Sequence, residues 1–188
     1  DALPISPEVT EAVRELLQSR DGLMLGICNG FQALIKLGLV PYGDIRPMDE
    51  TCPTLTFNTI GRHQSRLVRT RVASDLSPWL SKCEVGDMHE IAISHGEGRF
   101  VASPELVAEL ATKGQIATQY VGQDGEPAMS LDVNPNGSVL AIEGITSPDG
   151  RVLGKMGHTE RSGEGLYKNV PGNKFQPLIE GGVSYFTE

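Results

Sequence analysis

The residue whose surroundings point most directly to chemistry is Cys28, at the centre of the segment Gly26-Ile27-Cys28-Asn29-Gly30. This is the Gly-x-nucleophile-x-Gly pattern of a nucleophile elbow, in which the glycines permit a sharp turn that lifts the central side chain above a sheet. A thiol at the start of a helix is near the positive end of the helix dipole, which favours the thiolate. The backbone N–H of Asn29 would point to the place where an oxyanion forms. The alternative is that Cys28 is a small buried hydrophobic residue at a tight turn.

A thiolate nucleophile needs a group that accepts its proton and returns it, and histidine is the usual one. The chain has histidines at positions 63, 89, 95 and 158. His158 follows a predicted strand, as Cys28 does, and sites in open α/β sheets assemble at that edge of the sheet. Glu160 is spaced to accept a hydrogen bond from His158 and to fix its tautomer. Taken alone, His158-x-Glu160 is more typical of a surface histidine beside a solvated carboxylate.

The elements that must position these residues are predicted from the spacing of apolar residues. Ser6-Pro7 starts a helix, because serine can cap free amides and proline suits the first turn, and Asp21-Gly22 ends it. The apolar run 23–27 is typical of a strand that is covered on both faces. From Gly30 the apolar residues return to helical spacing, up to Gly38. The sequence therefore predicts a strand, a one-residue turn at Cys28 and a helix.

Further elements are predicted downstream from alternating apolar residues and from turn residues. The predicted strands are 66–72, 90–94, 115–121, 139–145 and 151–156, and a helix is predicted for 104–113. Helices among buried strands predict an α/β fold, with a sheet flanked by helices and hairpins added in the second half. The tail after Val170 is rich in glycine and proline and is expected to wrap the surface. Residues 1–188 are predicted to form a single domain.

The composition narrows the class of protein. Apolar residues make up 39% of the chain and charged residues 21%, which is an ordinary globular mixture. Acidic residues outnumber basic ones by 24 to 16, and the net charge of −8 argues against nucleic acid as a partner. No apolar run is long enough to span a bilayer and no signal peptide is visible, so a cytoplasmic protein is predicted. The three widely spaced cysteines argue against a disulfide framework.

No metal site or nucleotide site is predicted within the chain. The spacing of His89 and His95 does not place both on one helix face, and no phosphate-binding glycine motif occurs. Four arginines lie within the range 62–71. Such a cluster usually marks a solvated strand face, and the alternative is contact with a partner or a phosphorylated substrate.

Several segments carry a resemblance to a known family. Gly26–Gln32 looks like the nucleophile segment of class I (triad-type) glutamine amidotransferases. The segments 58–63, 94–100 and 134–172 resemble the glutaminase domain of the phosphoribosylformylglycinamidine synthases, which are purine-pathway amidotransferases and carbon–nitrogen ligases. The sequence His-Thr-Glu-Arg at 158–161 is similar to the large, fused form of that enzyme, where stand-alone subunits tend to have His-Pro-Glu. The resemblance covers nearly the whole chain.

The resemblance implies a flavodoxin-like sheet of the class I amidotransferase type and the hydrolysis of glutamine. Cys28 would attack the side-chain carboxamide and form a glutamyl thioester. His158 would protonate the departing ammonia and then activate water, with Glu160 orienting its ring. The positions that hold substrate glutamine in related domains correspond here to Gln32, Ser94, His95 and Gly96.

The resemblance also implies partners and a longer parent chain. Ammonia would pass to a synthetase domain of the same enzyme, where ATP and Mg²⁺ activate formylglycinamide ribonucleotide; no cofactor is expected in this chain. Family members carry amino-terminal strands and a Gly-rich loop with a further oxyanion-hole amide. This chain is therefore expected to be the carboxy-terminal part of a longer protein, weakly active or inactive alone and prone to self-association. Two alternatives stay open, namely a γ-glutamyl hydrolase and a non-catalytic docking or regulatory module.

Overall fold

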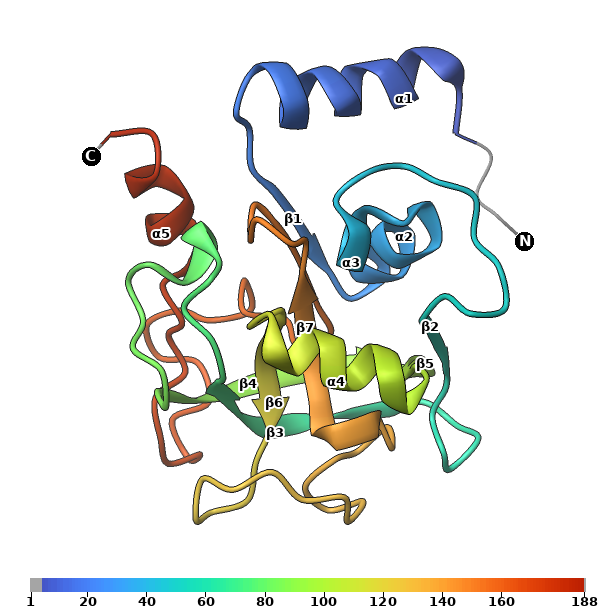
Figure 1. Ribbon diagram of the computed structural model, residues 1–188. Helices are drawn as coiled ribbons and strands as arrows, with labels where there is room; N and C mark the ends of the chain where they lie inside the picture. The colour runs from blue at the N-terminus through green and yellow to red at the C-terminus, as the bar shows by residue number, and fades with distance from the viewer. Residues whose placement is uncertain (1–4, 188) are drawn as a thin grey trace.

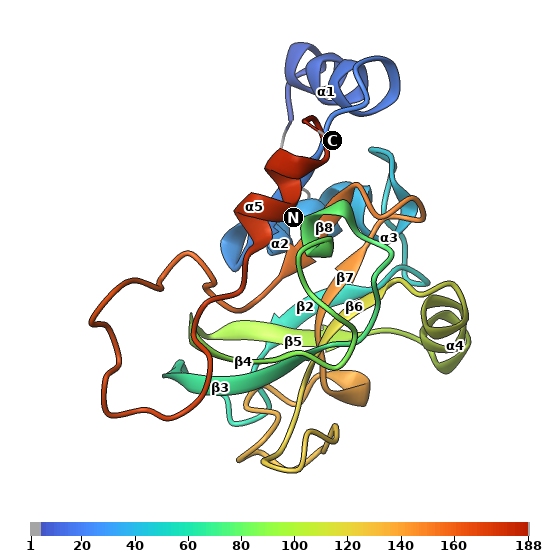
Figure 2. The ribbon, with the colours of Figure 1, turned by 90° about the vertical axis from the view of Figure 1, so that its left-hand side faces the viewer.

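A curled six-stranded sheet with the strand order β1-β8-β7-β6-β3-β4 lies at the centre of the structure, a computed structural model that describes residues 5–187 (Figures 1 and 2). Its strands are β1 (Met24–Ile27), β3 (Gln64–Val72), β4 (Met88–His95), β6 (Ile116–Tyr120), β7 (Ile142–Thr146) and β8 (Val152–Lys155). β1 and β8 are parallel, and the other neighbours in this sheet are antiparallel. A separate antiparallel pair consists of β2 (Thr54–Phe57) and β5 (Glu97–Val101). The predicted α/β class is confirmed, with a mixed sheet.

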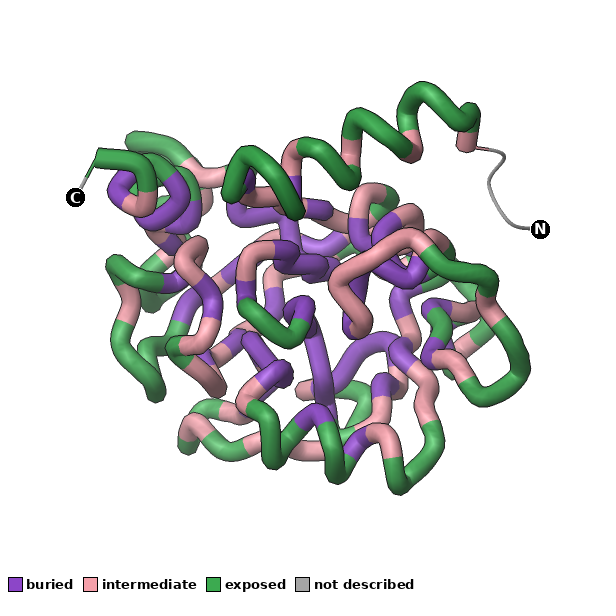
Figure 3. Tube along the Cα trace, turned by 45° about the horizontal axis from the view of Figure 1, so that its top comes forward, coloured by how far each residue is buried: buried purple, intermediate pink, exposed green. Residues whose placement is uncertain are grey.

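The helices surround this sheet. They are α1 (Pro7–Arg14), α2 (Asn29–Leu37), α3 (Leu39–Tyr42), α4 (Pro104–Thr112) and α5 (Leu178–Ser184); a π-helical turn (Glu15–Ser19) follows α1, and 3₁₀ turns occupy Pro78–Leu80 and Val139–Ala141. α2 packs on β1 and β8, whereas α1 lies apart from the sheet and has no buried residue (Figures 1 and 3). The turn at Cys28 therefore lies where the parallel strands β1 and β8 meet the helix that covers them.

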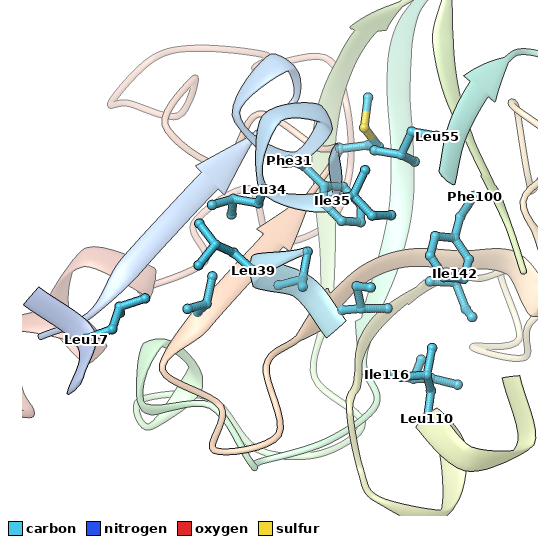
Figure 4. Packing of buried hydrophobic residues seen from close by; sticks show 14 residues of the cluster. Leu17, Phe31, Leu34, Ile35, Leu39, Leu55, Phe100, Leu110, Ile116 and Ile142 are labelled. Atoms are coloured by element: carbon cyan, nitrogen blue, oxygen red, sulfur yellow. The ribbon is translucent and has the colours of Figure 1, made fainter. Parts of the chain in front are cut away.

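The core beneath this segment is built from the apolar face of α2. Phe31, Leu34 and Ile35 are at most 5% exposed and belong to one cluster that extends to Phe100 and Ile142 (Figure 4). Their helical spacing places all three α2 residues on one face, which explains why this part of the sequence folds as a helix against the sheet. Gly38 ends the helix in the left-handed conformation, with φ of 82°.

Packing of β8 against α2 leaves no room for a side chain at position 154. A Cβ atom there would lie 2.2 Å from Cδ2 of Phe31, which is fully buried. We expect Gly154→Ala to lower the free energy of unfolding by about 1–3 kcal/mol, because an overpacked core must shift. Gly30→Ala is the matched control: its Cβ would meet nothing within 4 Å, and alanine suits a helix. Equal losses in the two variants during urea unfolding would contradict this account.

Most of the predicted elements are confirmed. Ser6 caps α1 by accepting a hydrogen bond from the N–H of Val9, and the helix at 104–113 and four of the five downstream strands occur with small shifts in their ends. The strand predicted for 139–145 begins only at Ile142, because residues 139–141 form a 3₁₀ turn. Both faces of β1 are covered, as expected for residues 23–27: Met24 packs in the cluster of α2, and Leu25 packs in a second cluster with Leu178 of α5. Three of its four residues are only half-buried, because β1 is an edge strand of the six-stranded sheet. The tail after Val170 is not wholly irregular, because it contains α5.

The arginines of the range 62–71 do not form one face. Side chains alternate along β3, and three of its arginines have partners in the chain. Arg66 donates to the carbonyl of Asp132, Arg69 pairs with Glu90, and Arg71 pairs with Glu126. These contacts favour the interpretation of a solvated strand over that of a docking surface.

Candidate active site

Cys28 occupies a strained turn between β1 and α2. Its backbone has φ of 53° and ψ of −106°, in the region that side chains rarely adopt. A Cβ at Gly26 would lie 2.7 Å from the carbonyl carbon of Gly30 and 2.4 Å from Cδ1 of Leu34, so only glycine allows strand and helix to approach this closely. The backbone thus has the form of the predicted nucleophile elbow.

The structure places Cys28 and His158 at the same end of the sheet, beyond the carboxyl ends of β1 and β8. The N–H of Cys28 donates to the carbonyl of Lys155 at 2.8 Å, at the end of the parallel pair β1–β8. Beyond that pair, strand β4 contacts both residues: the thiol of Cys28 lies 3.7 Å from the carbonyl of Ser94, and the N–H of His158 donates to the carbonyl of Ala92 at 2.8 Å. Two residues that are far apart in the sequence thus contact neighbouring positions of one strand.

The imidazole of His158 is oriented by Glu160. Nδ1 of the ring lies 2.6 Å from Oε1 of Glu160, and the His158 side chain is 10% exposed. The other ring nitrogen, Nε2, is buried and has no hydrogen-bond partner among the described residues. With Nδ1 holding a proton toward the carboxylate, Nε2 is free to accept one.

The pKa of the Cys28 thiol is shifted in the opposite direction to the one predicted from its place at the start of a helix. Burial raises the pKa of the thiol, and Glu160 adds to this; the N–H of Asn29 and the charge of Arg161 lower the pKa. The net direction is upward, so the predicted preference for a thiolate at the helix start is outweighed by desolvation. Ionisation of this thiol therefore requires a base that takes the proton.

Three of the four residues predicted to hold a substrate lie together beside this edge. Nε2 of Gln32 donates to the carbonyl of Glu97 at 2.5 Å, which ties the start of α2 to the start of β5. Ser94 contributes the carbonyl at the Cys28 thiol, and its hydroxyl lies 3.0 Å from His63. A Cβ at Gly96 would meet nothing within 4 Å. These residues form a rim next to the thiol.

His95, the fourth residue, has a different environment. Its side chain is buried, and its Nδ1 lies 3.1 Å from Oδ1 of Asn58. The amide of Asn58 also donates to the His95 carbonyl at 2.8 Å and accepts the N–H of Gly98 at 3.2 Å. Asn58 therefore shapes the turn between β4 and β5, a role that sequence reasoning missed although the segment 58–63 drew attention to it.

The stability of this turn is expected to depend on pH. Burial, with a contribution from His63, lowers the pKa of His95 to about 4. In the unfolded chain the pKa of His95 is about 6.5, so below that pH the unfolded chain binds a proton at His95 that the folded chain does not bind. The folded state therefore keeps its full stability above pH 6.5 and loses stability as the pH falls toward 4. We expect the free energy of unfolding to fall between pH 6.5 and 4.5 by about 2 kcal/mol more in the wild type than in His95→Gln. Parallel pH profiles in urea unfolding would contradict this assignment.

Two further residues without a predicted role are buried next to the site. Lys155 and Glu143 are fully buried, and the only signal in the sequence was a charged residue within each of two apolar strands.

Among residues 5–187, no group of histidine, cysteine, aspartate and glutamate side chains is arranged to hold a metal ion. Within the same range, no helix is long and apolar enough to cross a membrane.

Comparisons with known proteins agree on one family. The profile of the CobB/CobQ-like glutamine amidotransferase domain matches residues 1–187. The phosphoribosylformylglycinamidine synthase subunit PurQ of Symbiobacterium thermophilum is 37% identical over 171 residues, which cover 91% of this chain and 67% of that protein. The same subunit of Moorella thermoacetica is 34% identical over 176 residues, covering 94% and 67%. This chain thus spans about two thirds of the length of these relatives.

A solved structure gives the same result. The structure of PurLQS from Thermotoga maritima superposes with a TM-score of 0.65 at 26% sequence identity. The match covers 94% of this chain and 71% of that one. The similarity therefore extends over nearly the whole of this chain.

Proposed function

Since the chain belongs to the family of CobB/CobQ-like glutamine amidotransferase domains, we propose that it hydrolyses the side-chain amide of glutamine with Cys28, His158 and Glu160. The observation that carries this proposal is the buried Nε2 of His158, which lacks a partner and lies at the same sheet edge as the thiol. A thiol whose pKa is raised needs such an acceptor. His95 ends the neighbouring strand β4, but burial lowers its pKa to about 4, which makes its ring a poorer proton acceptor.

In the proposed reaction, the thiol proton moves to Nε2 of His158 as Sγ attacks the carboxamide carbon. The N–H of Asn29, at the start of α2, stabilises the oxyanion. His158 then gives the proton to the departing nitrogen, which leaves as ammonia, and a glutamyl thioester remains on Cys28. Water, deprotonated by His158, attacks the thioester; glutamate leaves and the thiol is restored. Glu160 keeps the ring in the tautomer that these transfers need.

The rim beside the thiol is where we place the substrate. Gln32 and Ser94 would fix glutamine from two elements, and the open space at Gly96 admits its backbone end. His95 would take part through its main chain, because its ring is buried against Asn58.

The relatives suggest the fate of the ammonia. They are subunits of phosphoribosylformylglycinamidine synthase, so we propose that the ammonia passes to a synthetase domain that makes formylglycinamidine ribonucleotide. ATP and Mg²⁺ would act in that domain. In the reaction proposed here, the site in this chain uses its side chains, the N–H of Asn29 and water.

Labelling combined with an ammonia assay tests this function. The chain is treated with a glutamine analogue that carries an electrophilic diazoketone, and the adduct is located by mass spectrometry. We expect one adduct, on Cys28, and ammonia release from free glutamine at the low rate expected of this chain alone. An adduct on Cys52 or Cys83 would overturn the assignment; burial already raises the pKa of Cys83 to about 11, which disfavours its reaction. Preference for γ-glutamyl peptides would indicate a hydrolase, and absence of any adduct a docking module.

A further inference from the structure

Two buried charged side chains hold the residues on either side of His158. Lys155 on β8 and Glu143 on β7 are both fully buried, with Nζ 3.6 Å from Oε1. Nζ of Lys155 donates to the carbonyl of Gly157 at 3.2 Å and to the hydroxyl of Thr159 at 2.6 Å. The N–H of Gly157 donates to Oε1 of Glu143 at 2.5 Å. The ion pair is therefore hydrogen-bonded to both sequence neighbours of His158, Gly157 and Thr159.

The residues around Glu143 and Lys155 are hydrogen-bonded to the pair or leave space for it. The hydroxyl of Thr118 donates to the second carboxylate oxygen of Glu143, and the hydroxyl of Thr159 donates to Gln176 at 2.9 Å. A Cβ at Gly157 would lie 2.8 Å from Oε1 of Glu143, so a side chain at that position would displace the carboxylate. Apart from the Nε2 of Gln176, the polar atoms of this network have partners.

Stability alone does not account for the pair. Taking two charges out of water is costly, and well-packed apolar residues in place of a buried ion pair often give an equally or more stable protein. Glu160, the side-chain partner of His158, is 48% exposed and by itself restrains the ring weakly. Lys155 also accepts the N–H of Cys28 through its carbonyl at 2.8 Å. One residue thus contacts the nucleophile with its main chain and the histidine loop with its side chain.

We propose that Lys155 and Glu143 are positioning residues for the reaction, which fix the peptide groups before and after His158 so that Nε2 stays within reach of the Cys28 thiol. The inference rests on the proposed function and extends it to two residues that touch neither substrate nor the reacting atoms. Its chemical consequence is measurable, because proton transfer between Cys28 and His158 falls steeply when the two groups are misplaced.

The main test replaces both charges at once, in the variant Glu143→Met/Lys155→Met. Loss of one partner leaves a buried charge unpaired and destabilises the fold strongly, whereas loss of both leaves no unpaired charge. We expect the double variant to be folded in the absence of denaturant but to unfold at a lower denaturant concentration than the wild type, because the N–H of Gly157 and the hydroxyl of Thr118 lose their acceptor. Its kcat for glutamine should fall about 10- to 100-fold with little change in KM. The pH dependence of Cys28 alkylation by iodoacetamide should move toward that of His158→Ala.

Thr159 provides a second, milder test that does not depend on the double variant folding. Thr159→Val removes the hydroxyl that accepts from Lys155 and keeps the side-chain shape, and it should lower kcat about tenfold; Thr159→Ser should restore it. The control is Lys113→Met, which removes an exposed ion pair with Glu109 on α4. This variant should change neither kcat nor the pH dependence of Cys28 alkylation.

Two results would overturn the inference. One is a folded double variant with the wild-type alkylation profile and kcat; the other, if that variant does not fold, is Thr159→Val with wild-type values. Failure of the proposed function is distinguishable from both. If the wild type releases no ammonia from glutamine but the alkylation profiles of wild type and variants differ as expected, the substrate is wrong and the positioning role of Lys155 and Glu143 stands.

Discussion

Cys28→Ser is expected to lower the rate of ammonia release from glutamine by about 10³- to 10⁶-fold while the fold persists. Serine fits the space of the thiol, so the elbow and its contacts with Lys155 are retained. Its hydroxyl is a far weaker acid and a poorer nucleophile than a thiol, and no other group at the sheet edge can form the thioester. Ammonia release at saturating glutamine, together with the circular dichroism spectrum, measures the two parts of this expectation.

Two matched variants make the result specific to Cys28. Cys52 and Cys83 are also half-buried free cysteines, and neither has the positive φ of the turn at Cys28. Cys52→Ser and Cys83→Ser should keep the wild-type rate and the single adduct with the glutamine analogue. A Cys28→Ser protein that keeps more than about a tenth of the activity would show that the proposed covalent step is wrong.

The sharp turn at Cys28 was predictable because its signal in the sequence is local. A strand, two glycines and a helix within a short segment specify the turn, and the structure shows the positive φ that this turn requires at Cys28. The charge state was not predictable in the same way. The helix dipole acts locally, but the desolvation that raises the pKa of Cys28 depends on residues such as Ser94 that fold over the thiol from another strand.

The network behind His158 lay beyond sequence reasoning for a related reason. Glu143 and Lys155 stand on neighbouring antiparallel strands, and their contact depends on the register that pairs Gly144 with Lys155. A lone charge in an apolar strand is equally compatible with an edge strand that faces water. The pairing of β7 with β8 had to be known before the two charges could be recognised as a buried pair.

The elements that were missed share a dependence on tertiary contacts. β5 begins in the glycine-rich segment 96–98, which reads as a loop, yet it is held by pairing with β2 and by Asn58. α5 contains Gly181 and Gly182, which disfavour a helix; a Cβ at Gly181 would lie 2.4 Å from the carbonyl of Trp79, so the glycines serve close packing. Packing outweighed propensity in both elements.

The second large effect is expected for His158. His158→Ala should lower kcat for glutamine by about 10²- to 10⁴-fold, since it removes the group that takes the thiol proton and returns it to the departing ammonia. Because burial raises the pKa of Cys28, alkylation of the thiol in this variant should require a more alkaline solution than in the wild type. Rates of iodoacetamide reaction from pH 6 to 10, with added imidazole as a rescue, measure this.

Glu160→Gln separates proton transfer from orientation of the ring. The Glu160 side chain is 48% exposed, and its contact with His158 is therefore screened, so we expect a loss of only about tenfold. Added imidazole should restore part of the rate in His158→Ala and none in Glu160→Gln. If Glu160→Gln instead costs as much as His158→Ala, orientation of the ring depends on Glu160 alone. The buried pair of Lys155 and Glu143 would then contribute less than its contacts with Gly157 and Thr159 suggest.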